Sequence, residues 1–117
     1  KDHEGRPLVT VFAEELVSHA IGKMRKFGIS QIPVIKDNEF VGSIDDSVIY
    51  QTLVEQPELR DAAISSIMGP VFPVVKSGTH LEELCKLINK HTPAVLVEME
   101  DGTKHIVTRY DIISAMS

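Results

Sequence analysis

The apolar residues of this chain follow two alternating spacings, one typical of a strand and the other typical of a helix. Short β-favouring runs such as LVTVF (8–12) and VFPVV (71–75) predict strands, because branched and aromatic side chains suit a pleated sheet. Each run is followed by apolar residues at helical spacing, so strand and helix alternate twice in the same order. The first helical set is Leu16, Val17, Ala20, Ile21, Met24 and Phe27, and the second is Leu81, Leu84, Cys85 and Ile88.

Charged and turn-forming residues mark the ends of these two predicted helices. Glu14 and Glu15 precede the first helix and Gly28 follows it, an order that suits the helix dipole and gives the helix a stop. Thr79-x-x-Glu82 predicts a capping box at the start of the second helix, in which side chains satisfy unpaired backbone N–H groups. Both helices therefore have defined ends as well as apolar faces.

Two further strands follow each of these helices and are joined by tight turns. Asp37-Asn38 and Asp101-Gly102 are the turn signals, because these residues tolerate the backbone angles of a hairpin turn. We therefore expect one hairpin in each half of the chain. Its strands are predicted at IPVIK (32–36) with EFVGSI (39–44), and at PAVLVE (93–98) with KHIV (104–107).

A second helix closes each half, beginning near Asp45 and near Thr108. Between the halves, QPELRDAAISSIMGP (56–70) predicts a linker helix that begins at Pro57 and ends at Gly69. Each half is too small to bury its own sheet face, so we expect the two halves to pack sheet against sheet.

The two halves form an internal repeat with an offset of 63 residues. Aligned pairs include Leu8 with Val71, Val11 with Val74, Ile21 with Leu84, and Ile44 with Val107. The predicted fold class is α+β (α/β), built from tandem βαββα repeats. The expected organisation is a linker remnant at 1–7, a first repeat at 8–55, a linker helix at 56–70 and a second repeat at 71–117.

Composition and charge narrow the class of protein. With 43% hydrophobic and 25% charged residues, the sequence is typical of a soluble globular domain. A net charge of -5 argues against a nucleic-acid surface, which needs a basic face, and no stretch has the roughly 18 apolar residues of a membrane span. The single cysteine, Cys85, excludes an intrachain disulfide and favours a cytoplasmic location. Its place on an apolar helical stripe predicts a buried thiol.

No catalytic or metal-binding pattern stands out. The histidines (His3, His19, His80, His91 and His105) have none of the spacings of a zinc site, so we expect no metal. The sequence has no glycine-rich phosphate loop and no nucleophile elbow. We therefore expect neither a catalytic cofactor nor enzyme activity.

Three features together resemble a known family. They are the doubled βαββα order, the segment GISQIPVI (28–35), and IVTRYDI (106–112), where a strand runs through Thr-x-x-Asp into a helix. Over residues 8–116 they resemble a cystathionine-β-synthase-type (CBS) domain pair, also called a Bateman module. The resemblance implies a pseudo-twofold pair with an adenosyl ligand (AMP, ADP, ATP or S-adenosylmethionine) in the cleft between the repeats. It also implies a regulatory role toward an attached or partner enzyme, channel or transporter, and a homodimer.

Thr108 and Asp111 admit two interpretations. As a capping box, both side chains offset unpaired backbone N–H groups, which contributes about 1 kcal/mol and needs no ligand. As a ligand site, the helix N-terminus and the Thr108 hydroxyl bind a phosphate, while Asp111 accepts hydrogen bonds from both hydroxyls of a ribose. The two interpretations are compatible, and the resemblance favours ligand contact.

The resemblance implies that the first repeat completes this cleft. Ile29 and Ile32 then sandwich an adenine while the backbone of Ser30 and Gln31 reads its edge; the alternative is that both isoleucines are plain core residues. His105 departs from the family, which usually has glycine three residues before the threonine. The full predicted set is Leu8, Val9, Thr10, Ile29, Ser30, Gln31, Ile32, Pro33, Val107, Thr108, Arg109 and Asp111.

The equivalent place in the first repeat lacks a carboxylate. Asp45 aligns with Thr108, but Val48 stands where Asp111 stands, so the ribose acceptor is missing and Asp45 repels a phosphate. We therefore expect a second, degenerate cleft, formed by Asp45, Val48, Thr92, Pro93 and Ala94.

Two functions stay open at this point. One is a sensor that binds an adenosyl ligand, and the alternative is a structural dimerisation module whose degenerate sites bind none, as Val48 and His105 indicate. In either case the closing helices carry apolar rows that predict a homodimer interface. These rows are Val48, Ile49 and Leu53 in the first repeat, and Ile112, Ile113 and Met116 in the second.

Overall fold

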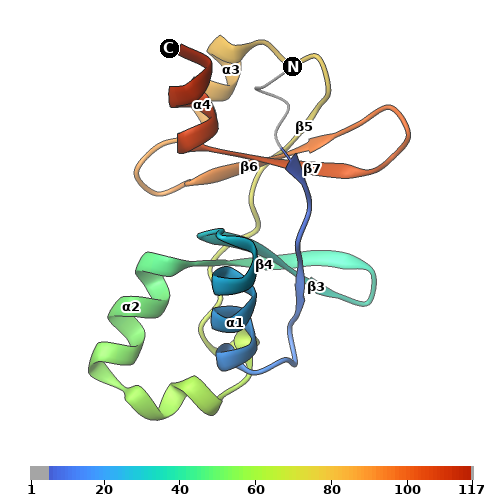
Figure 1. Cartoon of the computed structure of the whole chain (residues 1–117). Coiled ribbons are helices and arrows are strands. Elements are labelled where there is room, and N and C mark those ends of the chain that lie inside the picture. The colour runs from blue at the N-terminus through green and yellow to red at the C-terminus, as the bar shows by residue number, and fades with distance from the viewer. Residues whose placement is uncertain (1–5, 117) are drawn as a thin grey trace. The chain divides into compact units, whose positions relative to one another are not determined.

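The computed structural model describes residues 6–116, which divide into two compact units (Figure 1). The first unit comprises residues 9–71, and the second comprises residues 72–116 together with 6–8. Most of the linker remnant expected at 1–7 lies outside the described residues, which begin at residue 6.

The first unit is a three-stranded sheet with two helices on one face (Figure 1). Its sheet has the order β2-β3-β4, in which β2 is parallel to β3 and β3 is antiparallel to β4. Alternate strand side chains meet the helices in a core that includes Val11, Ile32 and Ile44. The elements are β2 (Val11–Phe12), α1 (Val17–Phe27), β3 (Gln31–Lys36), β4 (Glu39–Asp45) and α2 (Asp46–Glu55).

The second unit repeats this pattern and adds one strand. Its sheet has the order β1-β7-β6-β5, with β5 parallel to β6 and the other pairs antiparallel. The core side chains on the helix-facing side are Leu84, Val95, Val97, Val107 and Ile112. The elements are β1 (Arg6–Pro7), β5 (Val74–Lys76), α3 (Leu81–Leu87), β6 (Ala94–Glu98), β7 (Lys104–Thr108) and α4 (Arg109–Met116). The predicted α+β fold of tandem βαββα repeats is therefore confirmed.

Several local predictions are confirmed by backbone geometry. Gly28 ends α1 in the left-handed conformation, with φ 64°, where its N–H donates to the Met24 carbonyl. Asp37 and Asn38 both have positive φ, 54° and 65°, which is the conformation that a two-residue hairpin requires. Gly102 also has positive φ, 88°, in the other hairpin. These turn residues fix the register of both hairpins.

Two predictions about helices are wrong. Thr79 does not cap α3, because its hydroxyl donates to the Lys76 carbonyl at 2.6 Å, and His80 occupies the N-cap position without a side-chain cap. The linker is two short 3-10 helices, Pro57–Asp61 and Ile64–Ser66, and not one helix over 56–70. The linker is not one continuous helix because the extended residues between the two 3-10 helices pair with the start of α1.

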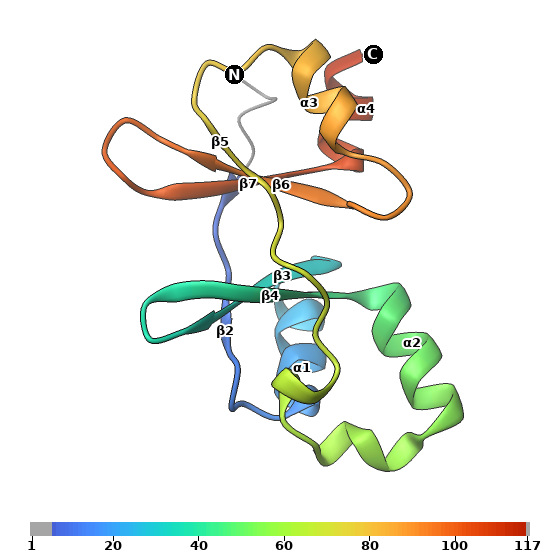
Figure 2. The same cartoon turned by 180° about the vertical axis from the view of Figure 1, so that it is seen from behind.

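Hydrogen bonds show how this break is held. The Val17 N–H donates to the Ala62 carbonyl at 2.9 Å, and Ala63 forms an antiparallel bridge with Leu16. The linker thereby packs against the start of α1 and then runs alongside β4 (Figure 2). There, Gly69 and Ser43 exchange two backbone hydrogen bonds of 3.1 and 2.8 Å.

The opening strands are shorter than the apolar runs predict. Residues 8–10 lie before β2, and residues 71–73 lie before β5. An unexpected pairing precedes the first run, because Arg6 pairs with Ile106 in β7. At the offset of 63 residues this pair is the counterpart of Gly69 with Ser43. The stretch before each repeat therefore joins the edge strand of the other repeat.

Candidate functional site

Thr108 and Asp111 lie together at the junction of β7 and α4. The Thr108 N–H donates to Asp111 Oδ2 at 2.8 Å, and the Thr108 hydroxyl donates to the same oxygen at 3.1 Å. Thr108 is buried, with 7% of its surface exposed. The Asp111 half of the predicted capping box is therefore confirmed, because this carboxylate in the first turn of α4 accepts from the Thr108 N–H. The Thr108 hydroxyl donates to the same carboxylate, so a cap made by Thr108 stays a prediction.

Arg109, the first residue of α4, is an exposed side chain with a specific partner. Its Nη1 donates to the Asn89 carbonyl at 3.0 Å. The Asn89 side chain in turn accepts from the backbone N–H groups of His91 and Thr92, at 2.9 and 3.1 Å. Arg109 thus ties the start of α4 to the turn that precedes β6. This turn carries Thr92 and Pro93, two of the residues predicted for the degenerate cleft, and β6 begins with the third, Ala94.

Val107 and His105, which precede Thr108 on β7, are both held by the packing of the second unit. Val107 is fully buried in the core beneath α3 and α4, so that only its backbone is available for other contacts. His105, where the family usually has glycine, pairs with Val97 on one side and Pro7 on the other. Its Nδ1 atom is buried and has no hydrogen-bond partner among residues 6–116.

In the first unit, the two side chains predicted to sandwich an adenine belong to the hydrophobic core. Ile32 is fully buried and Ile29 packs against the same core, so the core role of both side chains is confirmed. Their contact with a ligand stays a prediction. Pro33 follows Ile32 and therefore lies on the opposite face of the sheet from it.

Ser30 and Gln31 are tied to the start of α2. The Ser30 carbonyl accepts from the Asp46 N–H at 2.9 Å, and Gln31 Nε2 donates to Asp45 Oδ1 at 3.2 Å. The second oxygen of Asp45 accepts from the Ser47 hydroxyl at 2.6 Å. This network orders the segment that enters β3, and it occupies both carboxylate oxygens at the N-cap of α2.

Val48 occupies the position in α2 that Asp111 occupies in α4, so the first unit has no carboxylate at this place. It lies in the first turn of α2 and is 39% exposed. The N-cap residue of α2, Asp45, makes no side-chain cap hydrogen bond to the helix backbone. The two helix starts therefore differ in chemistry as the sequence predicts.

The remaining predicted residues are Leu8, Val9 and Thr10, which connect β1 to β2. All three are half-buried. The Thr10 carbonyl accepts a hydrogen bond from Lys23 Nζ on α1 at 2.6 Å. The sequence analysis did not single out Lys23, because a basic residue in the middle of a helix gives no sign of which backbone it reaches.

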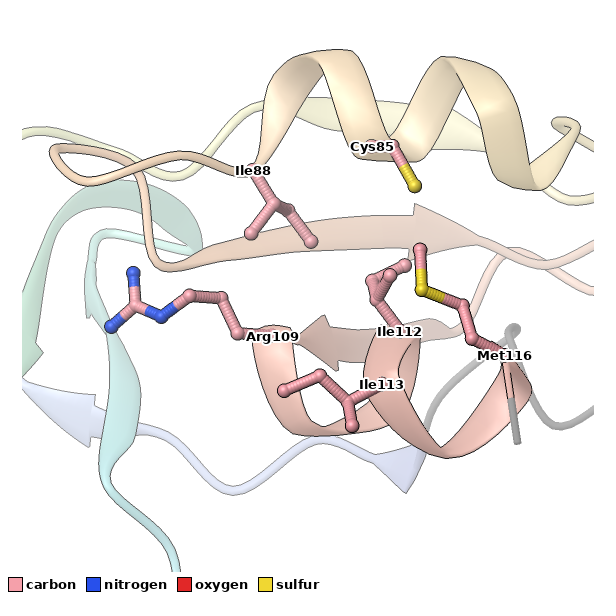
Figure 3. Close-up of a pocket in the computed structure, with 6 residues that line it drawn as sticks. All are labelled: Cys85, Ile88, Arg109, Ile112, Ile113 and Met116. Atoms are coloured by element: carbon pink, nitrogen blue, oxygen red, sulfur yellow. The ribbon is translucent and has the colours of Figure 1, made fainter.

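A groove between α3 and α4 is an apolar hollow in the second unit. It has a volume of about 200 Å³, and Figure 3 shows the Cys85 sulfur and the Met116 side chain facing it from the two helices. Cys85 is exposed, so the prediction of a buried thiol is wrong. Cys85 lies on α3 (Leu81–Leu87) and faces the groove, which leaves its side chain open to solvent. The groove is lined by Cys85, Ile88, Arg109, Ile112, Ile113 and Met116.

The described residues contain neither a candidate metal site nor a candidate membrane helix. Nowhere in residues 6–116 do three His, Cys, Asp or Glu side chains come together as metal ligands. In the same range, each helix is too short or too polar to cross a bilayer.

Comparison with known proteins gives consistent matches over both units. The model of the CBS domain family matches residues 2–55 and again residues 64–117. A protein with CBS domains from Burkholderia ambifaria superimposes with a TM-score of 0.83 at 19% identity, covering 96% of this chain and 84% of that one. A CBS-domain containing protein from Agrobacterium tumefaciens gives 0.83 at 18%, covering 99% and 94%. CBSX2 from Arabidopsis thaliana, solved in complex with AMP, gives 0.74 at 22%, covering 98% and 94%.

Proposed function

Because this chain belongs to the CBS domain family, we propose that it is a regulatory module that binds an adenosyl ligand and so controls an attached or partner protein. The observation that carries the proposal is the pair formed by Thr108 and Asp111 at the start of α4. We propose no catalytic role for it. A cytoplasmic location is part of the proposal and is supported by the single cysteine of the chain.

The chemistry of this helix start suits a nucleoside phosphate. The first turn of α4 presents backbone N–H groups and the positive end of the helix dipole, which favour an anion. A carboxylate accepts up to about four hydrogen bonds, so the two from Thr108 do not by themselves exhaust Asp111. Asp111 can therefore cap the helix and also accept from a ribose diol.

Arg109 adds a cation at the same helix start. Its guanidinium has five donors, and the Asn89 carbonyl accounts for one of them in this structure. We propose that further donors of Arg109 contact a ligand phosphate while the bond to Asn89 keeps the side chain in place. AMP is the first compound to test, since the related CBSX2 binds it. ADP, ATP and S-adenosylmethionine belong to the same proposal.

The remaining members of the predicted set stay part of the proposal. Backbone groups of Ser30 and Gln31 would read the adenine, and the Asp45 network already orders that segment. Residues 8–10 would contribute backbone as well. The proposed cleft with Asp45 and Val48 would bind an adenosyl ligand more weakly, because it has no ribose carboxylate.

A structural dimerisation module is the second candidate, and exposed apolar side chains on α2 and α4 favour it. Val54 on α2 and Ile113 and Met116 on α4 are 63%, 64% and 65% exposed. The predicted rows need correction, because Ile49 and Ile112 are buried core residues and Leu53 packs against the core of the first unit. The exposed members still support a homodimer, which is compatible with ligand binding.

Thermal unfolding with a panel of compounds separates the two candidates. AMP, ATP and S-adenosylmethionine are tested on the full chain, with GMP as the control for the base. A compound present at 100 times its Kd should raise the free energy of unfolding by about 2.7 kcal/mol. If no adenosyl compound raises the melting temperature more than GMP does, the sensor proposal is wrong and the dimerisation module stands.

A further inference from the structure

We propose that Lys23 is a positioning residue for the ligand site, which holds the segment 8–10 in the conformation that the ligand meets. The inference rests on the proposed function, because that function brings Leu8, Val9 and Thr10 against the adenosyl ligand. Lys23 lies on α1 and belongs to no part of the predicted ligand-binding set.

The contact that carries the inference is short and charge-assisted. Lys23 Nζ donates to the Thr10 carbonyl at 2.6 Å, and the bond is partly buried. An ionised donor makes a hydrogen bond roughly twice as strong as a neutral one, and partial burial shields it from competing water. The basic residues further along α1 differ, since Arg25 is exposed and Lys26 lies over the Phe27 ring at 5.3 Å.

The topology explains why this segment needs a tether. β1 ends at Pro7, which pairs with His105 in β7, whereas β2 begins at Val11, which pairs with Val34 in β3. The chain thus leaves one sheet and enters the other across residues 8–10, which belong to neither strand. Lys23 fixes the last residue of this passage directly before β2 begins.

A segment that is ordered before binding loses less conformational freedom when the ligand arrives. Lys23 would therefore act on affinity through preorganisation and without touching the ligand. Loss of its ammonium group should loosen residues 8–10 locally, while the hydrophobic core of the first unit, built from Val11, Ile32, Ile44 and their neighbours, stays intact.

The test is a calorimetric titration of the full chain with AMP and with S-adenosylmethionine. Lys23→Met removes the donor but keeps most of the aliphatic stem, and we expect its Kd to be about tenfold higher than that of the parent. Arg25→Met removes the same charge from an exposed place on the same helix and should leave the Kd unchanged. Lys23→Arg restores a cationic donor and should recover most of the affinity.

Amide hydrogen exchange supplies a readout that does not depend on the ligand. In Lys23→Met, the amides of residues 9–12 should exchange faster than in Arg25→Met, with equal melting temperatures. If Lys23→Met does not fold, Lys23→Ala, which also lacks a donor, takes its place with the same expectations. Parent and Lys23→Met binding with equal Kd would overturn this inference alone. Failure of the parent to bind either compound would overturn the proposed function and this inference with it.

Discussion

The second helices of the two units begin in different ways, although they occupy the same place in the repeat. α4 begins with Thr108 and Asp111 joined by two hydrogen bonds. α2 begins with Asp45, whose carboxylate bonds to Gln31 and Ser47, and has Val48 where the second carboxylate would be. Yet α2 forms over 10 residues and α4 over 8, so the fold does not require the Thr-x-x-Asp pair. The pair is therefore available for the ligand contact proposed above, in addition to its role at the helix start.

The edge strands show a second difference. Gly42 in β4 and His105 in β7 correspond at the offset of 63 residues. A Cβ atom at Gly42 would lie 2.6 Å from the Met68 sulfur and 2.8 Å from the Gly69 carbonyl, because the returning linker crosses the strand there. In the second unit a histidine is accommodated at the corresponding place, beside Pro7 of β1. The same topology thus demands glycine in one unit and not in the other.

The largest expected effect comes from removing the carboxylate that distinguishes α4 from α2. Asp111→Ala should weaken AMP binding by about 100-fold, because two charged hydrogen bonds to the ribose are lost. The loss of unfolding free energy should be only about 1 kcal/mol, the share of a cap. Calorimetry and thermal unfolding measure the two quantities.

Glu83→Ala is the control for Asp111→Ala, since Glu83 is an exposed acidic residue in the first turn of α3. It should leave AMP binding unchanged. An Asp111→Ala variant that binds AMP as tightly as the parent would leave only the capping interpretation.

Gly42→Ala tests the difference between the edge strands. The added methyl group meets the Gly69 backbone, so the linker must shift, and overpacking of this kind costs about 1–3 kcal/mol. Gly22→Ala is a matched control, because a Cβ at this position in α1 meets nothing within 4 Å and alanine favours the helix. Chemical denaturation should show a loss for Gly42→Ala and a small gain for Gly22→Ala. Equal stability of the two variants would show that the linker does not press on β4.

The exposed apolar row of α4 predicts a homodimer in solution. Light scattering of the parent at micromolar concentration should give about 26 kDa, twice the chain mass of 13.0 kDa. Ile113→Glu places a charge on that row and should shift the mass toward the monomer, because an unpaired charge in an apolar interface is costly. Phe27→Glu, at an exposed apolar position at the end of α1, should remain dimeric. A parent mass of 13 kDa, with and without AMP, would contradict the homodimer.

A double substitution should convert the first unit toward the second. Asp45→Thr with Val48→Asp recreates Thr-x-x-Asp at the start of α2, and Val48 is exposed enough to accept the change. We expect the number of AMP molecules bound per chain to rise from one toward two, with weaker affinity at the new site, because Gln31 loses its partner in Asp45. A calorimetric stoichiometry that stays at one would show that the asymmetry does not lie in these two residues.

Short-range patterns allowed most of the fold to be predicted from the sequence. The helical spacing before Gly28, the turn residues Asp37 and Asn38, and the repeat itself depend on neighbours along the chain, and all three are confirmed. The linker break and strand β1 could not be foreseen, because they depend on partners far away in sequence, Leu16 and Ile106.

The candidate site was predictable to the same extent. Thr108 and Asp111 are three residues apart, so their contact follows from helix geometry. Arg109 with Asn89 and Lys23 with Thr10 join separate elements, and nothing in the local sequence indicates them. The exposure of Cys85 was missed because helical spacing identifies an apolar stripe, whereas the burial of each residue on it depends on neighbouring elements such as α4.

The smallest expected effect concerns the hairpin of the second unit, where a side chain supports the turn. The Thr103 hydroxyl donates to Asp101 Oδ1 at 2.6 Å, and the Thr103 N–H donates to the same oxygen at 3.0 Å. The hydroxyl bond has the larger effect, and together the two bonds hold the pKa of Asp101 below its ordinary value of 3.8. A carboxyl whose pKa is depressed by folding stabilises the folded state above its unfolded pKa and loses that contribution as the pH falls through the lower folded value. Thr103→Val removes the hydroxyl donor, so the pKa of Asp101 should rise toward its ordinary value of 3.8, and the stability at pH values below it should depend less on pH. NMR titration of the Asp101 carboxyl measures the first change and acid denaturation the second. Thr79→Val is the control, because it removes a hydroxyl that donates to the Lys76 carbonyl, and it should leave the Asp101 titration and the acid denaturation unchanged. An Asp101 titration that Thr103→Val does not affect would show that the hydroxyl bond does not form in solution.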